Sequence, residues 1–411
     1  MSLLWCALFL LVPGPASEWL QWGGPTRDFQ LPASGLAATW PASGPRQLWK
    51  RPLGDGYSTV LTDGRTLYTL FKRGANTVVT ALDTATGNTV WETAFDEPLL
   101  TKDEKEYMDL VHGNAPASTP VISGDRLFAI TYMGRLVALN RATGRTIWSQ
   151  ELWRKLGGTP VEYGYTSSPL LYKDTIILPV GGDGQGMMAF RQSDGAIVWK
   201  GGRRDKAMSS PMMIQVDGEQ QVVTVMLKEV LAVSPDSGKV LWSFPHLNKT
   251  ETNVTSIVWC PGNIVLVSSA YGAGTHAIHL EHKDGKTVPT ALWFNQKMRV
   301  HHGNMMQIGD YVYASSGDFG PAPVTAVKIS TGEVVWQDRT FSKANFLRVG
   351  DQVIINDEDG RIALVQLTPE GMKVLSQAQA PLSNPAWTAP TLAGKTLYLR
   401  DRATIVAYDL S

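Results

Sequence analysis

The sequence predicts an all-β fold, an eight-bladed β-propeller built from four-stranded antiparallel blades. The first observation is a pattern of eleven residues that begins with Ala, has Gly at its seventh position and ends with Trp. The second is the regular spacing of its copies, and the third is a half copy at each end of the chain. The five clean copies are residues 81–91 (ALDTATGNTVW), 138–148 (ALNRATGRTIW), 189–199 (AFRQSDGAIVW), 232–242 (AVSPDSGKVLW) and 326–336 (AVKISTGEVVW).

Each copy has the composition of a β-hairpin. A small and an aliphatic residue end one strand, a polar run with Gly turns the chain, and β-branched residues lead into Trp. Gly accepts a positive φ without a steric penalty, and Asp, Ser and Thr bond to the turn's own backbone. Another hairpin precedes the pattern, which gives four strands per unit. These first hairpins are expected at residues 121–130, 170–179, 306–314, 346–356 and 391–400.

Degraded copies of the pattern complete the count of blades. The fifth copy is stretched to residues 277–293 by an insertion around residues 283–290, and the seventh, residues 363–375, ends in Leu instead of Trp. Successive copies then give eight units of about 47 residues, the length of a propeller blade. Their first residues are Ala81, Ala138, Ala189, Ala232, Ala277, Ala326, Ala363 and Ala407.

The two ends of the chain carry complementary halves of one copy. The chain stops in the middle of the eighth copy, four residues after Ala407, whereas Trp49 lies in a strand-like stretch with no first half before it. We expect the N-terminal strand with Trp49 to complete the last blade as its outer strand. Such a closure removes the two free sheet edges of an open array.

The first 17 residues predict an export signal. In residues 1–17 (MSLLWCALFLLVPGPAS) an apolar core too short to span a bilayer is followed by Pro, Gly and small residues. No Lys or Arg lies near Met1, which leaves an ordered apolar N-terminal segment as the alternative. We therefore expect one propeller domain over residues 18–411 of an exported, periplasmic or extracellular protein. Residues 18–45 are expected to form an extended lead-in across this domain.

Charge and cysteine content exclude several classes of function. The chain has 37 basic and 37 acidic residues without a long run of either, which argues against a nucleic-acid partner. Cys6 lies in the expected signal, so Cys260 is the only cysteine of the mature chain. An intrachain disulfide and a cysteine metal cluster are therefore not expected.

The pattern A-[LV]-D-x-x-T-G-x-x-x-W, preceded by G-x-L as in residues 134–139, resembles the repeat of pyrroloquinoline-quinone-type propellers. The resemblance covers residues 19–411. That family includes quinoprotein dehydrogenases and a propeller lipoprotein that assists outer-membrane barrel assembly and is not an enzyme. The resemblance implies that each Trp of the pattern docks between neighbouring blades. The docking residues are Trp49, Trp91, Trp148, Trp199, Trp242, Trp293 and Trp336.

The loops that lead into the innermost strands are where we expect a ligand site, because they surround the channel mouth of a propeller. The tripeptide His-Gly-Asn occurs twice, with His112 and Asn114 before the second blade and His302 and Asn304 before the sixth. These blades face each other in an eight-fold ring. A polar pocket and a reused turn remain open as explanations. Equivalent positions in other blades carry Tyr165, Lys206, Asn253, Asn345 and Trp387.

The sequence argues against a bound metal. His276 and His279 point to opposite faces of a strand, so with His282 they do not form a zinc tract. Residues 356–360 and 181–184 are interpreted as tight turns rather than calcium loops.

The chain also departs from the quinoprotein enzymes. The resemblance implies adjacent cysteines and a Glu, Asn and Asp set that holds calcium, and neither is found in this sequence. The sequence therefore favours a binding or scaffold module without bound quinone, whose ligand or protein partner is unknown. A quinone-dependent alcohol or sugar dehydrogenase that binds the quinone with calcium is the alternative.

Overall fold

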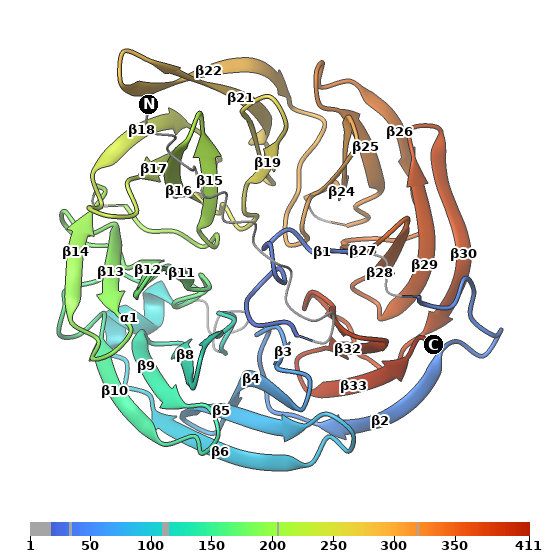
Figure 1. The fold of residues 1–411 in the computed structure, drawn as a ribbon, viewed down its shortest axis with the longest axis horizontal. Coiled ribbons are helices and arrows are strands. Elements are labelled where there is room, and N and C mark those ends of the chain that lie inside the picture. The colour runs from blue at the N-terminus through green and yellow to red at the C-terminus, as the bar shows by residue number, and fades with distance from the viewer. Residues whose placement is uncertain (1–17, 33–34, 109–114, 204, 319) are drawn as a thin grey trace, which may run out of the picture.

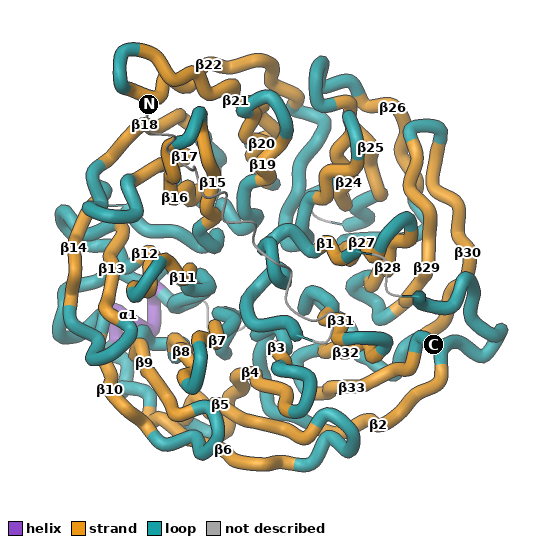
Figure 2. Tube along the Cα trace, viewed as in Figure 1, coloured by secondary structure: helices purple, strands orange, loops and turns teal. Residues whose placement is uncertain are grey.

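The computed structural model describes residues 18–411, apart from residues 33–34, 109–114, 204 and 319, as a ring of eight β-sheets around a central axis (Figure 1). Each sheet runs from an innermost strand near the axis to an outermost strand at the rim, with consecutive strands antiparallel. The tube view in Figure 2 shows almost only strands and loops. The predicted eight-bladed, all-β propeller is confirmed.

The first four blades follow one another along the chain. From the axis outward, blade 1 contains β3 (Leu61–Thr62), β4 (Thr66–Arg73), β5 (Asn76–Asp83) and β6 (Thr89–Asp96), and blade 2 contains β7 (Val121–Ser123), β8 (Arg126–Ile130), β9 (Arg135–Asn140) and β10 (Thr146–Glu151). Blade 3 contains β11 (Leu170–Tyr172), β12 (Thr175–Pro179), β13 (Met187–Arg191) and β14 (Ile197–Gly201). Blade 4 contains β15 (Met212–Val216), β16 (Glu219–Val225), β17 (Glu229–Val233) and β18 (Val240–Pro245).

The remaining blades include two strands from the N-terminal part of the chain. Blade 5 contains β19 (Val258–Cys260), β20 (Ile264–Ser269), β21 (Gly274–Lys283) and β22 (Lys286–Asn295), and blade 6 contains β23 (Met306–Ile308), β24 (Tyr311–Ser315), β25 (Val324–Lys328) and β26 (Val334–Asp338). Blade 7 contains β27 (Asn345–Val349), β28 (Gln352–Asn356), β29 (Arg361–Thr368) and β30 (Gly371–Gln379), with β1 (Gln30–Leu31) added inside β27. Blade 8 contains β31 (Thr391–Ala393), β32 (Thr396–Arg400), β33 (Thr404–Asp409) and, at the rim, β2 (Arg46–Pro52).

The strand β2 closes the ring. It pairs antiparallel with β33, and Trp49 lies opposite Ala407, as Trp91 lies opposite Ala81 within blade 1. The predicted closure, in which an N-terminal strand completes the last blade, is confirmed. Between blades 1 and 2 the chain also forms the short helix α1 (Lys102–Tyr107), which begins with a capping box at Thr101.

The Trp side chains of the repeated pattern contact the next blade through one recurring arrangement. The indole N–H of Trp199, in blade 3, donates to the carbonyl oxygen of Pro235 in blade 4 at 2.9 Å, and the ring lies against Gly238. Gly238 has a φ of 70°, and a Cβ atom there would overlap the Trp199 ring. The turn therefore requires glycine for its backbone and for the close approach of the indole. The same indole bond joins Trp49 to Thr84, Trp91 to Arg141, Trp148 to Gln192, Trp293 to Ile329 and Trp336 to Thr368.

Trp242 departs from this arrangement. Its indole N–H donates to the side-chain oxygen of Gln221, in its own blade, at 2.6 Å. The neighbouring blade 5 has the stretched copy of the pattern, in which β21 and β22 form a long hairpin. Thr287, in that hairpin, accepts a hydrogen bond from the Gln221 amide. The insertion thus replaces the usual carbonyl acceptor with a side-chain link between blades 4 and 5.

Candidate ligand cavity

The lead-in segment crosses one end of the central channel. The backbones of Trp19 and Thr62, on blade 1, exchange two hydrogen bonds of 2.8 and 3.0 Å. Two blades away, β1 pairs in parallel with β27 of blade 7, and Figure 1 shows the dark-blue segment passing through the middle of the ring between these points. Trp19 and Phe29 are fully buried. The segment therefore closes the channel at this end as part of the core.

Arg27 fastens the lead-in to blade 3. Its guanidinium donates to the carbonyl oxygens of Pro169 at 3.0 Å and Ser168 at 3.4 Å, and lies over the Trp22 ring at 5.5 Å. The side chain is only 4% exposed, and burial lowers its pKa to about 9. Within the described part of the chain no carboxylate forms an ion pair with it. A positive charge is thus buried against carbonyl dipoles instead of an anion.

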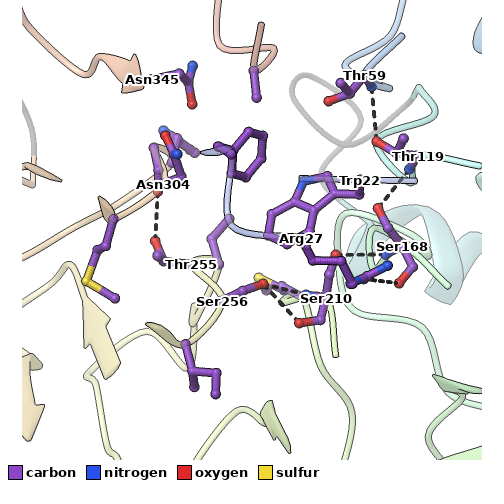
Figure 3. Close-up of a pocket in the computed structure, with 18 of the residues that line it drawn as sticks. Trp22, Arg27, Thr59, Thr119, Ser168, Ser210, Thr255, Ser256, Asn304 and Asn345 are labelled. Atoms are coloured by element: carbon purple, nitrogen blue, oxygen red, sulfur yellow. Dashed lines mark hydrogen bonds between the residues drawn. The ribbon is translucent and has the colours of Figure 1, made fainter. Parts of the chain in front are cut away.

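A cavity of about 580 Å³ lies on the axis beside this segment. One part of its wall comes from the lead-in, through Trp22, Arg27 and Phe29, and the rest comes from the loops before the innermost strands (Figure 3). Its lining includes aromatic and methionine side chains as well as hydroxyl groups. Concave sites of this size and mixed lining are typical of small-molecule sites in proteins.

An arc of hydroxyl groups joins blades 1 to 5 around the cavity. The backbone N–H of Thr59 donates to the hydroxyl of Thr119 at 3.1 Å, and the N–H of Thr119 donates to the hydroxyl of Ser168 at 2.9 Å. The N–H groups of Ser168 and Ser210 donate in the same way to the hydroxyls of Ser210 and Ser256. Each bond joins one blade to the next, as the dashed lines in Figure 3 show. The residues of the Ser-x-Pro steps therefore link the blades and line the cavity at the same time.

Blades 5, 6, 8 and 1 place an aromatic row along the cavity wall. The phenol oxygen of Tyr271 lies 2.7 Å from Nε2 of His301, and the rings of His301 and His302 are 3.6 Å apart. His302 in turn stacks on Trp387 at 4.1 Å, and Tyr57 stacks on Trp387 at 5.9 Å. All five side chains line the cavity.

Burial sets the protonation of Tyr271 and His301. It lowers the pKa of His301 to about 4, with a smaller contribution from the positive charge of Lys343, so the imidazole is neutral at pH 7. Burial first, and the negative charge of Asp318 second, raise the pKa of Tyr271. Asp318 accepts a hydrogen bond from the Tyr271 backbone at 3.0 Å and from Arg299 at 2.8 Å. The Tyr271 phenol and the His301 imidazole thus form a neutral hydrogen-bonded pair.

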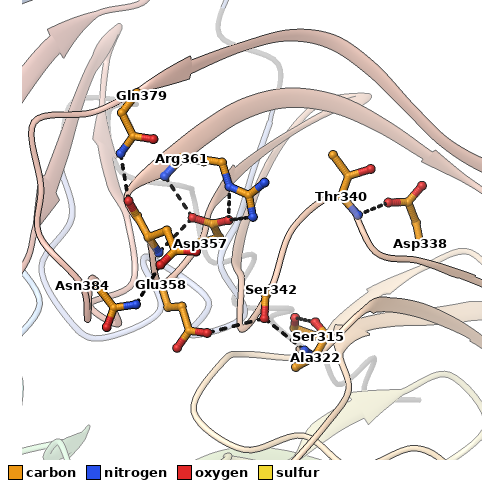
Figure 4. Close-up of polar contacts among 11 residues, drawn as sticks. Ser315, Ala322, Asp338, Thr340, Ser342, Asp357, Glu358, Arg361, Gln379 and Asn384 are labelled. Carbon is orange, nitrogen blue, oxygen red and sulfur yellow. Dashed lines mark hydrogen bonds and ion pairs between the residues drawn. The ribbon is translucent and has the colours of Figure 1, made fainter. Parts of the chain in front are cut away.

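A polar network in blades 6 and 7 fixes the position of the Trp387 indole. The Trp387 indole N–H donates to Glu358 at 3.3 Å, and Glu358 forms an ion pair of 3.2 Å with Lys343. Glu358 belongs to the turn between β28 and β29, which Asp357 shapes by accepting hydrogen bonds from Arg361 (Figure 4). Residues 356–360 therefore form a turn between the second and third strands of their blade.

The structure brings together four of the residues that the sequence selected. His302, Asn304, Asn345 and Trp387 line the cavity. The side chain of Asn304 exchanges two hydrogen bonds with the backbone of Phe346, and that of Asn345 donates to the Trp387 carbonyl. The two amides thus also link neighbouring blades.

The remaining selected residues lie elsewhere. Tyr165 is buried and donates to the Val180 carbonyl, Lys206 bonds the Tyr107 phenol, and Asn253 donates to three backbone carbonyls of its own neighbourhood. None of the three lines the cavity. His112 and Asn114 lie outside the described residues, so the expected juxtaposition of the two tripeptides stays a prediction.

The sequence predicted the lead-in but did not place it in the site, and it did not select His301, the residue beside His302. Trp22, Arg27 and Phe29 belong to a stretch without the repeat, and their place at the channel end depends on contacts with blades far along the chain. A basic residue among three aromatic residues of an otherwise unpatterned segment was the available signal. His301 and Tyr271 belong to neighbouring blades, and only the packing of blade 5 against blade 6 places them in contact.

The described residues do not supply a metal centre. No three His, Cys, Asp or Glu side chains gather among residues whose positions are described. The Nδ1 atoms of His276 and buried His246 are 3.2 Å apart. No third metal-ligating side chain joins this pair among the described residues. Cys260 is buried, and burial raises its thiol pKa to about 12. The described residues therefore do not provide a cluster that would hold calcium beside a quinone.

Part of the sequence matches known proteins. A family model described as outer membrane protein assembly factor BamB matches residues 75–338, more than half of the chain. A quinoprotein ethanol dehydrogenase of Pseudomonas putida is 28% identical over 125 residues. That match covers 30% of this chain and only 18% of the dehydrogenase.

Solved structures share the fold across nearly the whole chain. The crystal structure of BamB from Moraxella catarrhalis has a TM-score of 0.62 at 16% identity and covers 89% of this chain and 97% of its own. A quinohemoprotein alcohol dehydrogenase from Comamonas testosteroni has a TM-score of 0.69 at 14% identity and covers 97% of this chain and 81% of its own. At these identities the likeness concerns the fold alone. In the described part of this chain, no helix has the length and apolar character needed to cross a membrane.

Proposed function

The chain belongs to the family described as outer membrane protein assembly factor BamB, and on this premise we propose that it is a binding or scaffold propeller with a small-molecule site on its axis. The resemblance to pyrroloquinoline-quinone-type propellers, noted from the repeated pattern, is confirmed. Both scaffold and oxidoreductase relatives share this fold, so the function is argued from the cavity and not from the fold.

The observation that carries the proposal is the cavity of about 580 Å³ behind the lead-in. Trp22 and Phe29 of the lead-in form one wall of the cavity and shield a molecule inside from water on that side, which favours a ligand with an apolar part. The hydroxyl arc and the Tyr271–His301 pair add polar groups at defined positions. We include His302, Asn304, Asn345 and Trp387, all of which line the cavity, among the ligand-facing residues.

The test is a titration with N-phenyl-1-naphthylamine, an uncharged dye that fluoresces in apolar surroundings. Saturable binding at one site per chain is expected. Ala117, half-buried at the cavity wall, offers a way to fill the space: Ala117→Trp should abolish binding. Ala85→Trp, at an exposed turn residue, adds the same indole outside the cavity and should leave binding unchanged. Equal binding by both variants would exclude the axial site.

An oxidoreductase is the second candidate, favoured by the match to the quinoprotein ethanol dehydrogenase. Purified protein supplied with the quinone and calcium would then oxidise an alcohol or sugar with a redox dye as electron acceptor. Activity that is lost in His302→Ala would support a role for this cavity residue. Absence of saturable quinone uptake would leave the binding module as the only candidate.

We also propose export and a single domain. Residues 1–17 would be removed as a signal, and residues 18–411 would form the mature propeller in the periplasm or outside the cell. Mass spectrometry of the protein isolated from the cell envelope should show an N-terminus near residue 18. An uncleaved chain found in the cytoplasmic fraction would contradict export.

A further inference from the structure

The hydroxyl arc has hydrogen-bond donors that the blades do not use. Thr119, Ser168 and Ser210 each accept a backbone N–H through the hydroxyl oxygen. Among the described residues none of these three hydroxyls donates a hydrogen bond, whereas Ser256 donates back to the Ser210 carbonyl. An oxygen that already accepts a hydrogen bond is a better donor through its own hydrogen. Three polarised donors thus border the cavity on consecutive blades.

The buried guanidinium of Arg27 lies at the same side of the cavity. It donates to the Ser168 and Pro169 carbonyls, adjacent to the hydroxyl of Ser168, and has no carboxylate partner in the described part of the chain. Figure 3 shows Arg27 beside Ser168 and Ser210. A buried charge without a counter-ion costs free energy, and a bound anion would reduce that cost. The low pKa of Arg27 reflects the same uncompensated burial.

Two acidic groups line the cavity, and each has partners other than Arg27. Asp28 follows Arg27 in the lead-in and accepts from Thr26 at 2.6 Å and from the Gln30 backbone at 3.1 Å. Burial raises the pKa of its carboxyl, and the positive charge of Arg348 in blade 7 opposes this shift only weakly. Asp318 of blade 6 forms an ion pair with Arg299 at 2.8 Å. Arg27 and the three hydroxyl donors therefore lie toward blades 2 to 4, whereas Asp318 and the Lys343 cation, each with an ion-pair partner, lie toward blades 6 and 7.

We propose that Arg27 and the hydroxyls of Thr119, Ser168 and Ser210 form a subsite for an oxyanion, so that the cavity takes a small amphipathic anion. Its ligand would carry a carboxylate, phosphate or sulfonate group on an apolar body. The oxyanion accepts the three hydroxyl hydrogens near the positive charge, and the body fills the space between the methionine and aromatic side chains. The inference rests on the axial cavity being a ligand site.

Two matched dyes test the subsite. 8-Anilino-1-naphthalenesulfonate has the same aromatic body as N-phenyl-1-naphthylamine and adds one sulfonate. A purely apolar cavity would favour the uncharged dye, because burying a sulfonate without partners costs free energy. The oxyanion subsite predicts the reverse, with the sulfonate binding about tenfold or more tightly, since hydrogen bonds to charged groups are stronger than neutral ones.

Substitutions test which residues cause the preference for the sulfonate dye over the uncharged dye. Ser168→Ala combined with Ser210→Ala, and separately Arg27→Gln, should weaken binding of the sulfonate about tenfold and leave that of the uncharged dye within about twofold. Ser118→Ala is the matched control, because its hydroxyl donates to the Ser167 carbonyl and does not line the cavity. It should preserve the preference. A preference that survives both the double variant and Arg27→Gln would overturn the subsite.

A competition experiment needs no substitution and covers variants that fail to fold. Benzoate should displace the sulfonate dye from the unaltered protein at concentrations about tenfold below those of its uncharged analogue benzamide. Equal displacement would refute the subsite. If both dyes bind equally and Ala117→Trp blocks both, the oxyanion subsite is wrong and the ligand cavity stands. If neither dye binds, the proposed function itself is wrong.

Discussion

Replacing Trp199 by Ala tests the contact between neighbouring blades. The indole is 8% exposed, lies against Gly238 and donates one hydrogen bond of 2.9 Å to Pro235. Truncating a large buried aromatic side chain costs about 3 to 5 kcal/mol, so Trp199→Ala should lower the free energy of unfolding by that amount. Val198 precedes it and is 45% exposed. Val198→Ala should cost less than about 0.5 kcal/mol, as expected for a surface position.

Gly238 makes the experiment more specific. In the unaltered protein, Gly238→Ala introduces a Cβ that overlaps the Trp199 ring and also strains a residue whose φ is 70°. With Ala at position 199 the overlap disappears, and only the conformational cost of about 1 kcal/mol remains. The two substitutions should therefore be strongly non-additive in a double-mutant cycle.

The assay is urea unfolding, monitored by tryptophan fluorescence and by circular dichroism. The dependence of the free energy of unfolding on urea concentration is compared between variants. A loss below about 1 kcal/mol for Trp199→Ala would refute the docking role. Additive effects of Trp199→Ala and Gly238→Ala would show that the ring and the glycine do not constrain each other in solution.

Further predictions follow from the ring closure and from two buried histidines. Deleting residues 18–52 removes β2 and the channel closure, and should give aggregation in light scattering; a soluble protein with cooperative unfolding would contradict the closure. Burial, with a smaller contribution from the charge of neighbouring His276, lowers the pKa of His246 to about 3. Burial also lowers the pKa of His301 to about 4. Since the unfolded chain binds these protons near pH 6.5, stability should fall from pH 6.5 toward pH 4, by up to about 1.4 kcal/mol per pH unit for each group. Urea unfolding of His246→Gln should show a shallower decline, and an unchanged decline would exclude His246 as its cause.

Much of the fold was predictable because the repeat is local. Ala81, Gly87 and Trp91 belong to one hairpin, and the same spacing in other copies reports the same turn and pairing. The half copies at Trp49 and Ala407 predicted the closure for the same reason, since a β-strand at a sheet edge requires a partner. The site was less predictable, because polar residues of the innermost loops serve the blade contacts as well. Asn253 and Tyr165 satisfy buried carbonyls, and the sequence pattern does not separate this role from ligand binding.

The sequence by itself determined the number of blades, the position of each hairpin and the way in which the ring closes, because these depend on short-range pairing and on a periodic pattern. Only the tertiary structure decided which residues line the cavity on the axis. Arg27 lies 142 residues from Pro169, the carbonyl it bonds, and Tyr271 meets His301 from another blade. Contacts of this kind depend on loops converging at the axis after the ring has closed. They place a buried cation, three hydroxyl donors and an aromatic row around one cavity.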